Sequence, residues 1–204
     1  MNSTSKFRKV SLGPAAVVVE RDSAGQFLLR STTKLSPYPT RLTERLLYWA
    51  HEAPERTFIA KRVAGGDWRR ISYAQALDLA RRIGQALLDR GLSADRPLMI
   101  LSENDLEHAM LALAALHVGV PFVPVSSAYS LVSQDHAKLR HVTELMTPGL
   151  VFASDGSRYG RAIRAAISPD TELVVTLNPP SGRACIPVSE FTIIQRKSKN
   201  FLFR

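Results

Sequence analysis

Short apolar runs alternate with helical patterns through residues 97–177, and this alternation limits the possible folds more than any other feature. Four runs have the length and composition of buried strands, at 97–101, 122–125, 150–153 and 172–177. The intervals between them are expected to form helices, at 105–118, 133–146 and 155–167. A strand–helix rhythm of this kind predicts parallel pairing with right-handed crossovers, and therefore an α/β domain with helices on both faces of the sheet.

Two antiparallel hairpins are predicted before this region. Residues 14–33 hold two apolar runs around the turn Asp22-Ser23-Ala24-Gly25, and strands at 57–63 and 68–71 flank a glycine pair. A helix is expected between the hairpins, over 42–53. Ser72 and Gln75 then fit a capping box that opens a long helix, which we expect to end at Gly91 in a left-handed conformation.

The net charge of +9 is concentrated at the two ends of the chain. Residues 1–40 carry +4, residues 41–182 carry +1 and residues 183–204 carry +4. A nucleic-acid-binding protein usually gathers basic residues on one helix or face, with aromatic residues among them. We therefore expect no nucleic-acid partner. The pattern divides the chain into a polar tail (1–13), a domain (14–178) and an irregular basic tail (179–204).

Apolar and cysteine content indicate a cytoplasmic protein without a membrane span. The longest apolar stretch, Ala109–Leu116, is too short to cross a bilayer, and the run 15–19 is too short for the core of a signal peptide. A single cysteine, Cys185, excludes an internal disulfide and a zinc site with several thiolates.

Residue chemistry alone identifies no catalytic, cofactor-binding or metal-binding residue. Neither a phosphate-binding P-loop nor a Gly-x-Gly-x-x-Gly motif occurs, and no histidine pair has the spacing of a zinc site. Ser133, Asp135 and His136 resemble a nucleophilic set, but near neighbours on one helix cannot easily form a proton relay. A cluster of acids at a predicted helix start is expected to interact with the helix dipole: Glu103, Asp105 and Glu107.

Two longer segments carry a family resemblance. The sequence WRRISYAQAL at 68–77 and the sequence AALHVGVPFVPV at 114–125 resemble the first two conserved segments of the adenylate-forming enzymes, which include the acyl-CoA synthetases. Order and spacing also match. Within that superfamily the chain is most similar to feruloyl-CoA synthetases, through Tyr38-Pro39 and the segments at 42–46, 127–131 and 135–141. The resemblance covers residues 14–178.

The resemblance implies the N-terminal part of an AMP-binding domain and a two-step ligase. A carboxylic acid, here an aromatic acid of hydroxycinnamate type, reacts with ATP and magnesium to give an acyl-adenylate. Coenzyme A then displaces AMP and a thioester forms. In the family, the phosphates are held by a Ser/Thr/Gly-rich loop that ends in Pro-Lys.

That loop motif does not occur in the 204 residues. Residues 199–203 are similar to the apolar strand that precedes the loop, while 183–198 match the family poorly. We therefore expect a truncated or frameshifted product, inactive as this chain and with no cofactor of its own. The unpaired strand edges of such a fragment predict self-association or chaperone binding. The alternative is a non-catalytic interaction module or pseudoenzyme derived from the family.

Overall fold

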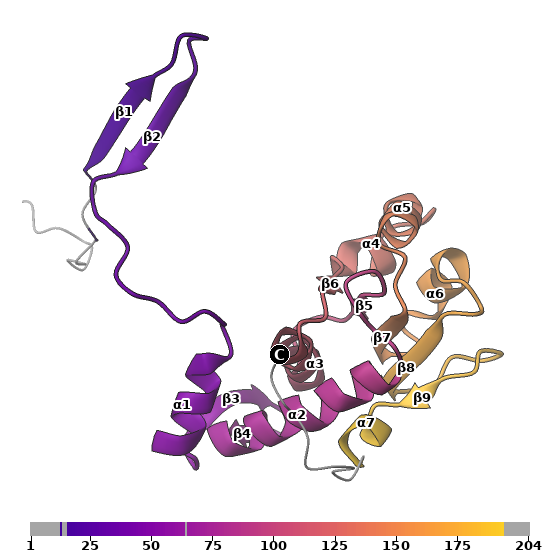
Figure 1. The fold of residues 1–204 in the computed structure, drawn as a ribbon. Helices are drawn as coiled ribbons and strands as arrows, with labels where there is room; N and C mark the ends of the chain where they lie inside the picture. Colours follow the sequence, from indigo (N-terminus) through magenta and orange to yellow (C-terminus); the bar gives the residue numbers. More distant parts are fainter. Residues whose placement is uncertain (1–12, 14–15, 64, 194–204) are drawn as a thin grey trace, which may run out of the picture. The chain divides into compact units, whose positions relative to one another are not determined.

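The computed structural model describes residues 13, 16–63 and 65–193. The chain divides into two compact units, one within residues 1–40 and one within residues 41–204 (Figure 1).

The first unit contains one β-hairpin. Strands β1 (Val17–Arg21) and β2 (Phe27–Ser31) pair antiparallel, with Val19 opposite Leu29. The turn is held by the Asp22 carboxylate, which accepts hydrogen bonds from the N–H groups of Ala24 and Gln26, both at 2.9 Å. Gly25 supplies a φ of +81°, as a tight turn requires. The predicted hairpin is confirmed, and every residue of both strands is exposed.

The second unit begins with a helix, a hairpin and a long helix. These elements are α1 (Glu44–Glu52), β3 (Thr57–Arg62), β4 (Trp68–Ser72) and α2 (Tyr73–Asp89). The capping box is present as predicted, because the Gln75 N–H donates to Ser72 Oγ at 3.3 Å and the Ser72 N–H donates to Gln75 Oε1 at 2.9 Å. Gly91 follows α2 with a φ of +68°.

A parallel sheet of five strands forms the centre of this unit. Its strands are β5 (Leu98–Leu101), β6 (Phe122–Pro124), β7 (Leu150–Asp155), β8 (Glu172–Leu177) and β9 (Ile186–Pro187). Their order is β6-β5-β7-β8-β9, and each neighbouring pair is parallel. The predicted α/β class is therefore correct.

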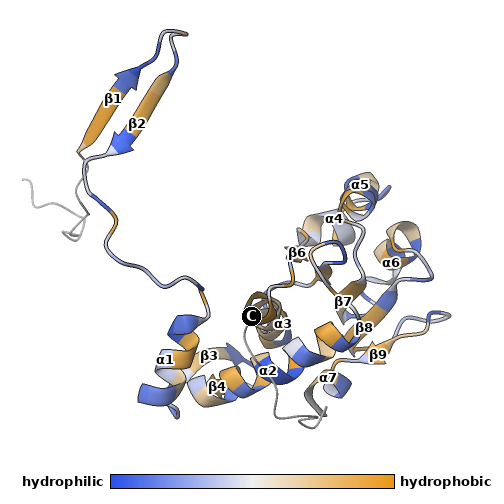
Figure 2. Ribbon diagram, in the orientation of Figure 1, coloured by the Kyte–Doolittle hydropathy of each residue, from blue (hydrophilic) through white to orange (hydrophobic). Residues whose placement is uncertain are grey.

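Helices cover both faces of the sheet, and the strands supply apolar side chains to each. Leu98 and Ile100 pack in a cluster with α2 and α3 (Leu106–Val118), whereas Met99 and Leu101 pack with α5 (Ala137–Met146) and α6 (Gly160–Ala166). Parallel strands buried on both faces are expected to be apolar throughout. Figure 2 shows apolar residues along α3 and the sheet, and polar residues along one side of α2.

Two helices begin later than their apolar patterns predict. The helix expected over 133–146 begins at Ala137, because the Ser133 hydroxyl accepts the His136 N–H at 3.0 Å and His136 takes a φ of +52°. A short helix that the pattern did not predict, α4 (Ser127–Leu131), precedes it. The helix expected over 155–167 begins at Gly160, because the Asp155 carboxylate accepts the N–H groups of Ser157 and Arg158. Polar side chains that bond nearby N–H groups compete with a helical turn in this way.

The described part of residues 179–204 is more regular than its sequence predicts. It contains β9 and α7 (Ser189–Ile193), and Phe191 of α7 is fully buried against the cluster that α2 and α3 form. The apolar stretch at 199–203 and most of the tail at 1–13 lie outside the described residues. Among the described residues, no helix has the length and hydropathy needed to cross a membrane.

Candidate functional site

The sheet has one point at which the chain changes direction across it. From β5 the chain moves outward to β6, and it then returns past β5 to β7 and continues to β8 and β9. In open parallel sheets, ligands bind outside the carboxyl ends of the strands at such a switch point. A ligand site is therefore expected at the carboxyl ends of β5 and β7.

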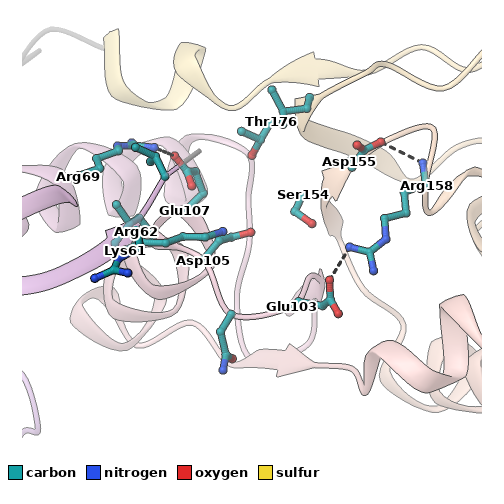
Figure 3. Close-up of a pocket in the computed structure, with 14 residues that line it drawn as sticks. Lys61, Arg62, Arg69, Glu103, Asp105, Glu107, Ser154, Asp155, Arg158 and Thr176 are labelled. Atoms are coloured by element: carbon teal, nitrogen blue, oxygen red, sulfur yellow. Dashed lines mark hydrogen bonds and ion pairs between the residues drawn. The ribbon is translucent and has the colours of Figure 1, made fainter. Parts of the chain in front are cut away.

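A cleft of about 470 Å³ lies at this edge (Figure 3). Its walls are residues that follow β5, the end of β7 with Arg158, Thr176 of β8, and basic residues of the β3–β4 hairpin. The charged side chains of the lining are Lys61, Arg62, Arg69, Glu103, Asp105, Glu107, Asp155 and Arg158. Four are basic and four acidic, so their formal charges cancel and the cleft is polar without a dominant sign.

The loop after β5 is fixed by Asp105, the N-cap residue of α3. Its carboxylate accepts the His108 N–H at 2.6 Å and the Ser102 hydroxyl at 2.7 Å. This is the favourable contact with the helix start that the sequence predicts. The same bonds occupy the carboxylate, so Asp105 serves the fold of the loop before any ligand.

Two ion pairs join segments that are distant in sequence. Arg69 of β4 binds Glu107 with 2.6 Å between Nη1 and Oε1, and Arg158 after β7 binds Glu103 after β5. Figure 3 shows the second pair joining the segment after β5 to the segment after β7. Both Arg158 and Glu103 are about half exposed, at 53% and 54%. The pair thus sets the relative position of two loops more than it adds to stability.

Asp155 connects the end of β7 to the segment after β8. Burial acts to raise the pKa of this carboxyl, but hydrogen bonds from the Arg158 N–H, the Asn178 amide at 2.8 Å and Ser157 together hold it below its ordinary value. Asp155 is therefore charged at neutral pH. With its oxygens accepting these bonds, it acts as a structural clamp and is poorly placed to remove a proton from a ligand.

Two hydroxyl groups beside the cleft are shielded from solvent. Burial, followed by the negative charge of Glu103, raises the pKa of Tyr159, so its phenol stays protonated. The Thr176 hydroxyl has no hydrogen-bond partner within the part of the chain that the structure describes. A ligand in the cleft could satisfy this buried hydroxyl without displacing an existing hydrogen bond.

The cleft does not by itself fit magnesium-bound ATP. Its carboxylates accept the bonds and ion pairs described above, and residues 16–63 and 65–193 contain no group of three histidine, cysteine or acidic side chains placed to hold a metal. A magnesium site needs carboxylate oxygens that can turn toward the ion.

The residues considered as a nucleophilic set lie in the loop before α5. The Ser133 hydroxyl donates to Asp135 at 3.0 Å, while His136 Nδ1 lies 3.3 Å from the Tyr129 carbonyl oxygen. The imidazole is thus engaged away from the Ser133 hydroxyl. His117 is buried at the end of α3, and His51 is exposed beside Glu52.

The sequence patterns missed the basic half of the cleft. Lys61 and Arg69 are opposite each other in the predicted β3–β4 hairpin, but only the folded chain brings this hairpin close to Arg158. One signal was present, because residues that follow neighbouring parallel strands meet at one edge of a sheet. Asp155 ends, and Arg158 follows, the strand next to the one that Glu103 follows.

Comparisons with known proteins include one family match and two curated relatives. The family described as "AMP-binding enzyme" matches residues 46–192. Luciferin 4-monooxygenase of Luciola mingrelica is 30% identical over 84 residues, which are 41% of this chain and 14% of that enzyme; the Photinus pyralis enzyme is 29% identical over the same length. The chain thus matches only a small part of either curated relative.

Solved structures share the fold at low identity. A putative long-chain-fatty-acid CoA ligase of Rhodopseudomonas palustris gives a TM-score of 0.57 at 21% identity, covering 74% of this chain and 36% of its own. The luciferase-like enzyme of the mealworm Zophobas morio gives 0.58 at 16% identity, covering 78% and 37%. A fatty acyl-adenylate ligase of L. pneumophila, solved with acyl adenylate and pyrophosphate, gives 0.53 at 15% identity, covering 74% and 24%.

Proposed function

This chain belongs to the AMP-binding enzyme family, and we propose that it represents the N-terminal part of a ligase that activates a carboxylic acid with ATP. The observation that carries the proposal is the family match over residues 46–192, which includes all five strands of the parallel sheet and the helices on both faces. The cleft at the switch point gives this part of the enzyme a surface on which the rest of an active site can be built.

The proposed reaction has two steps. A carboxylate oxygen attacks the α-phosphorus of ATP, which releases pyrophosphate and forms an acyl-adenylate. The thiol of coenzyme A then attacks the acyl carbon, loses its proton and displaces AMP. The proposed acid is aromatic and of hydroxycinnamate type, on the resemblance to feruloyl-CoA synthetases at 38–46 and 127–141. The proposed location is the cytoplasm, where a protein with one free cysteine keeps its thiol reduced.

We propose that the 204-residue chain does not catalyse either step alone. Charge that develops on transferring phosphates needs donors and a metal aimed at it. The cleft carboxylates already have partners, and the Ser/Thr/Gly-rich loop ending in Pro-Lys does not occur in the sequence. The role of these residues is therefore to position segments that other parts of such an enzyme would complete.

An ATP–pyrophosphate exchange assay with ferulate tests this proposal. The 204-residue chain is compared with a chain extended through the downstream coding sequence, read in all three frames. Exchange is expected only from an extended chain that carries the phosphate-binding loop. Exchange by the short chain contradicts its proposed inactivity. If the extended chain exchanges with benzoate or a fatty acid but not with ferulate, the ligase proposal stands and the hydroxycinnamate proposal fails.

A second candidate is a non-catalytic module, favoured by the edges of the sheet. The edge strands β6 and β9 have three and two residues, and short edge strands limit pairing with other chains. Size-exclusion chromatography of the purified chain separates the two ideas. A module is expected to elute as one defined species, whereas a dependent fragment is expected to self-associate or to co-elute with a chaperone.

A further inference from the structure

A second hollow lies where α1, β3, α2 and α3 meet, and it shares no lining residue with the cleft at the sheet edge. Figure 1 shows these elements side by side. The hollow has a volume of about 360 Å³, within the range of small-molecule sites. Apolar side chains form most of its surface: Leu42, Leu46, Trp49, Phe58, Tyr73 and Leu113.

Three aromatic rings make one continuous wall of this hollow. The Tyr73 ring centroid lies 5.2 Å from that of Phe58 and 6.1 Å from that of Trp49. The rings come from two helices and a strand, so their positions are set by regular structure. Leu46 is buried at the base, yet Trp49 and Phe58 remain 36% and 38% exposed. Aromatic surface held open to water on rigid elements favours a flat apolar ligand group.

Among the residues that the structure describes, one charged side chain lines the hollow, and it is basic. Arg45 is the only charged side chain among the eight described residues that line it, the eighth being Thr43. Burial, followed by the positive charges of Arg81 and Arg41, lowers the pKa of His117, one turn beyond Leu113 on α3. Guanidinium groups thus raise the positive potential at this end of α3. An occupant with an apolar body and a negative group complements both features.

We propose that this hollow binds a small aromatic carboxylate, with its ring against Trp49 and Tyr73 and its carboxylate at Arg45. The site is separate from the cleft at the sheet edge, and no step of the proposed ligase reaction depends on it. Binding here requires neither ATP nor any residue outside the described part of the chain.

Trp49 provides a direct reporter, because the chain has only one other tryptophan, Trp68. The full chain with Trp68→Phe is titrated with 3-phenylpropanoate, which does not absorb where tryptophan is excited. A saturable change in Trp49 emission is expected, with a Kd on the order of 1 mM for a ligand of this size. 3-Phenylpropanol, which keeps the ring and lacks the charge, is expected to bind about fivefold more weakly.

Two matched pairs of surface variants locate the site in the same background. Arg45→Gln is expected to weaken 3-phenylpropanoate about fivefold, whereas Arg164→Gln on the exposed side of α6 leaves the Kd unchanged. Leu42→Ser removes a lining residue that is 77% exposed and is expected to weaken binding, whereas Leu145→Ser, at 69% exposed on α5, has no effect. All four side chains are exposed, so the fold is retained.

Three results would overturn the proposal. Equal affinity for the acid and the alcohol removes the role of charge, and equal effects of Arg45→Gln and Arg164→Gln remove the role of this arginine. Emission that depends on protein concentration and not on 3-phenylpropanoate shows that a second copy of the chain covers the hollow. None of these results bears on the exchange assay, which tests the ligase proposal separately.

Discussion

Strands of similar apolar composition are exposed to solvent in the first unit and buried in the second. The hairpin strands hold three consecutive valines and two consecutive leucines, yet these side chains are 47–63% exposed. In β5 the residues Leu98–Leu101 are 0–1% exposed. Helices pack on both faces of the parallel sheet and bury its side chains. Neither hairpin strand contains a buried residue. An apolar run thus predicts a strand, but burial depends on what packs against it.

Neither face of the hairpin is packed against other residues of its unit, so the hairpin has low stability by itself. Val17, Val19, Phe27 and Leu29 share one face by their register, and an exposed ion pair of Glu20 and Arg30, 3.6 Å apart, lies on the other. A two-stranded hairpin without a packed face has little stability of its own. Global unfolding of the chain should therefore report on the unit that contains the sheet.

Matched phenylalanine substitutions give the largest expected contrast. Phe152→Ala empties a fully buried position in β7 and is expected to lower the free energy of unfolding by about 3–5 kcal/mol. Phe27→Ala removes a side chain that is 64% exposed in β2, and is expected to change it by less than about 0.5 kcal/mol. Urea unfolding followed by circular dichroism measures both. Equal losses would show that the hairpin packs as part of the cooperative core.

Matched glycine substitutions compare the two units again, with an expected loss of unfolding free energy smaller than that of Phe152→Ala. A Cβ on Gly156, after β7, would lie 2.6 Å from the Asn178 carbonyl oxygen and 2.8 Å from the Pro180 nitrogen. Because backbone atoms must move, Gly156→Ala is expected to cost about 1–3 kcal/mol of unfolding free energy.

The hairpin glycine is constrained by angle and not by space. Gly25 has a φ of +81°, and its nearest neighbour to a new Cβ is the Arg21 side chain at 3.7 Å. Gly25→Ala is expected to weaken the hairpin alone, by roughly 1–2 kcal/mol. Glu20 and Leu28 form a hydrogen-bonded pair of the hairpin, in phase with Asp22 and Gln26. Faster amide hydrogen exchange at these two residues, with an unchanged urea midpoint, would show this. A shifted midpoint would contradict the separation of the two units.

Sequence patterns predicted the elements that depend on local chemistry. The capping box of α2, the glycine at its end and the strands of the sheet follow from residues close together in the chain. The late starts of α5 and α6 were missed because Ser133 and Asp155 bond to N–H groups that a helical pattern assigns to the helix. The spacing of apolar residues carries no information about these side-chain hydrogen bonds.

Elements that depend on distant contacts were not predictable in the same way. Helix α7 is held by Phe191, whose ring lies 4.3 Å from the Arg90 guanidinium, and Arg90 also binds Glu172 at 2.9 Å. The Arg158–Glu103 pair of the cleft similarly spans 55 positions. Neither partner identifies the other in sequence, since only the parallel order of the strands brings them to one edge.

Histidine titration gives the smallest expected contrast, and it is confined to the second unit because every histidine lies at position 51 or later. Burial, then the charges of Arg81 and Arg41, hold the pKa of His117 below its unfolded value of 6.5. Below pH 6.5 the unfolded chain therefore binds a proton that the folded chain does not, and stability falls until the pH reaches the folded pKa; above 6.5 this contribution is constant. One proton limits the slope to about 1.4 kcal/mol per pH unit.

His117→Gln should remove this part of the acid-side loss in urea unfolding between pH 7 and 5, whereas His51→Gln, at an exposed position, should retain it. An identical pH dependence in both variants would mean that His117 exchanges protons as freely as an exposed histidine. Burial in the second unit would then protect its apolar side chains but not this titratable group.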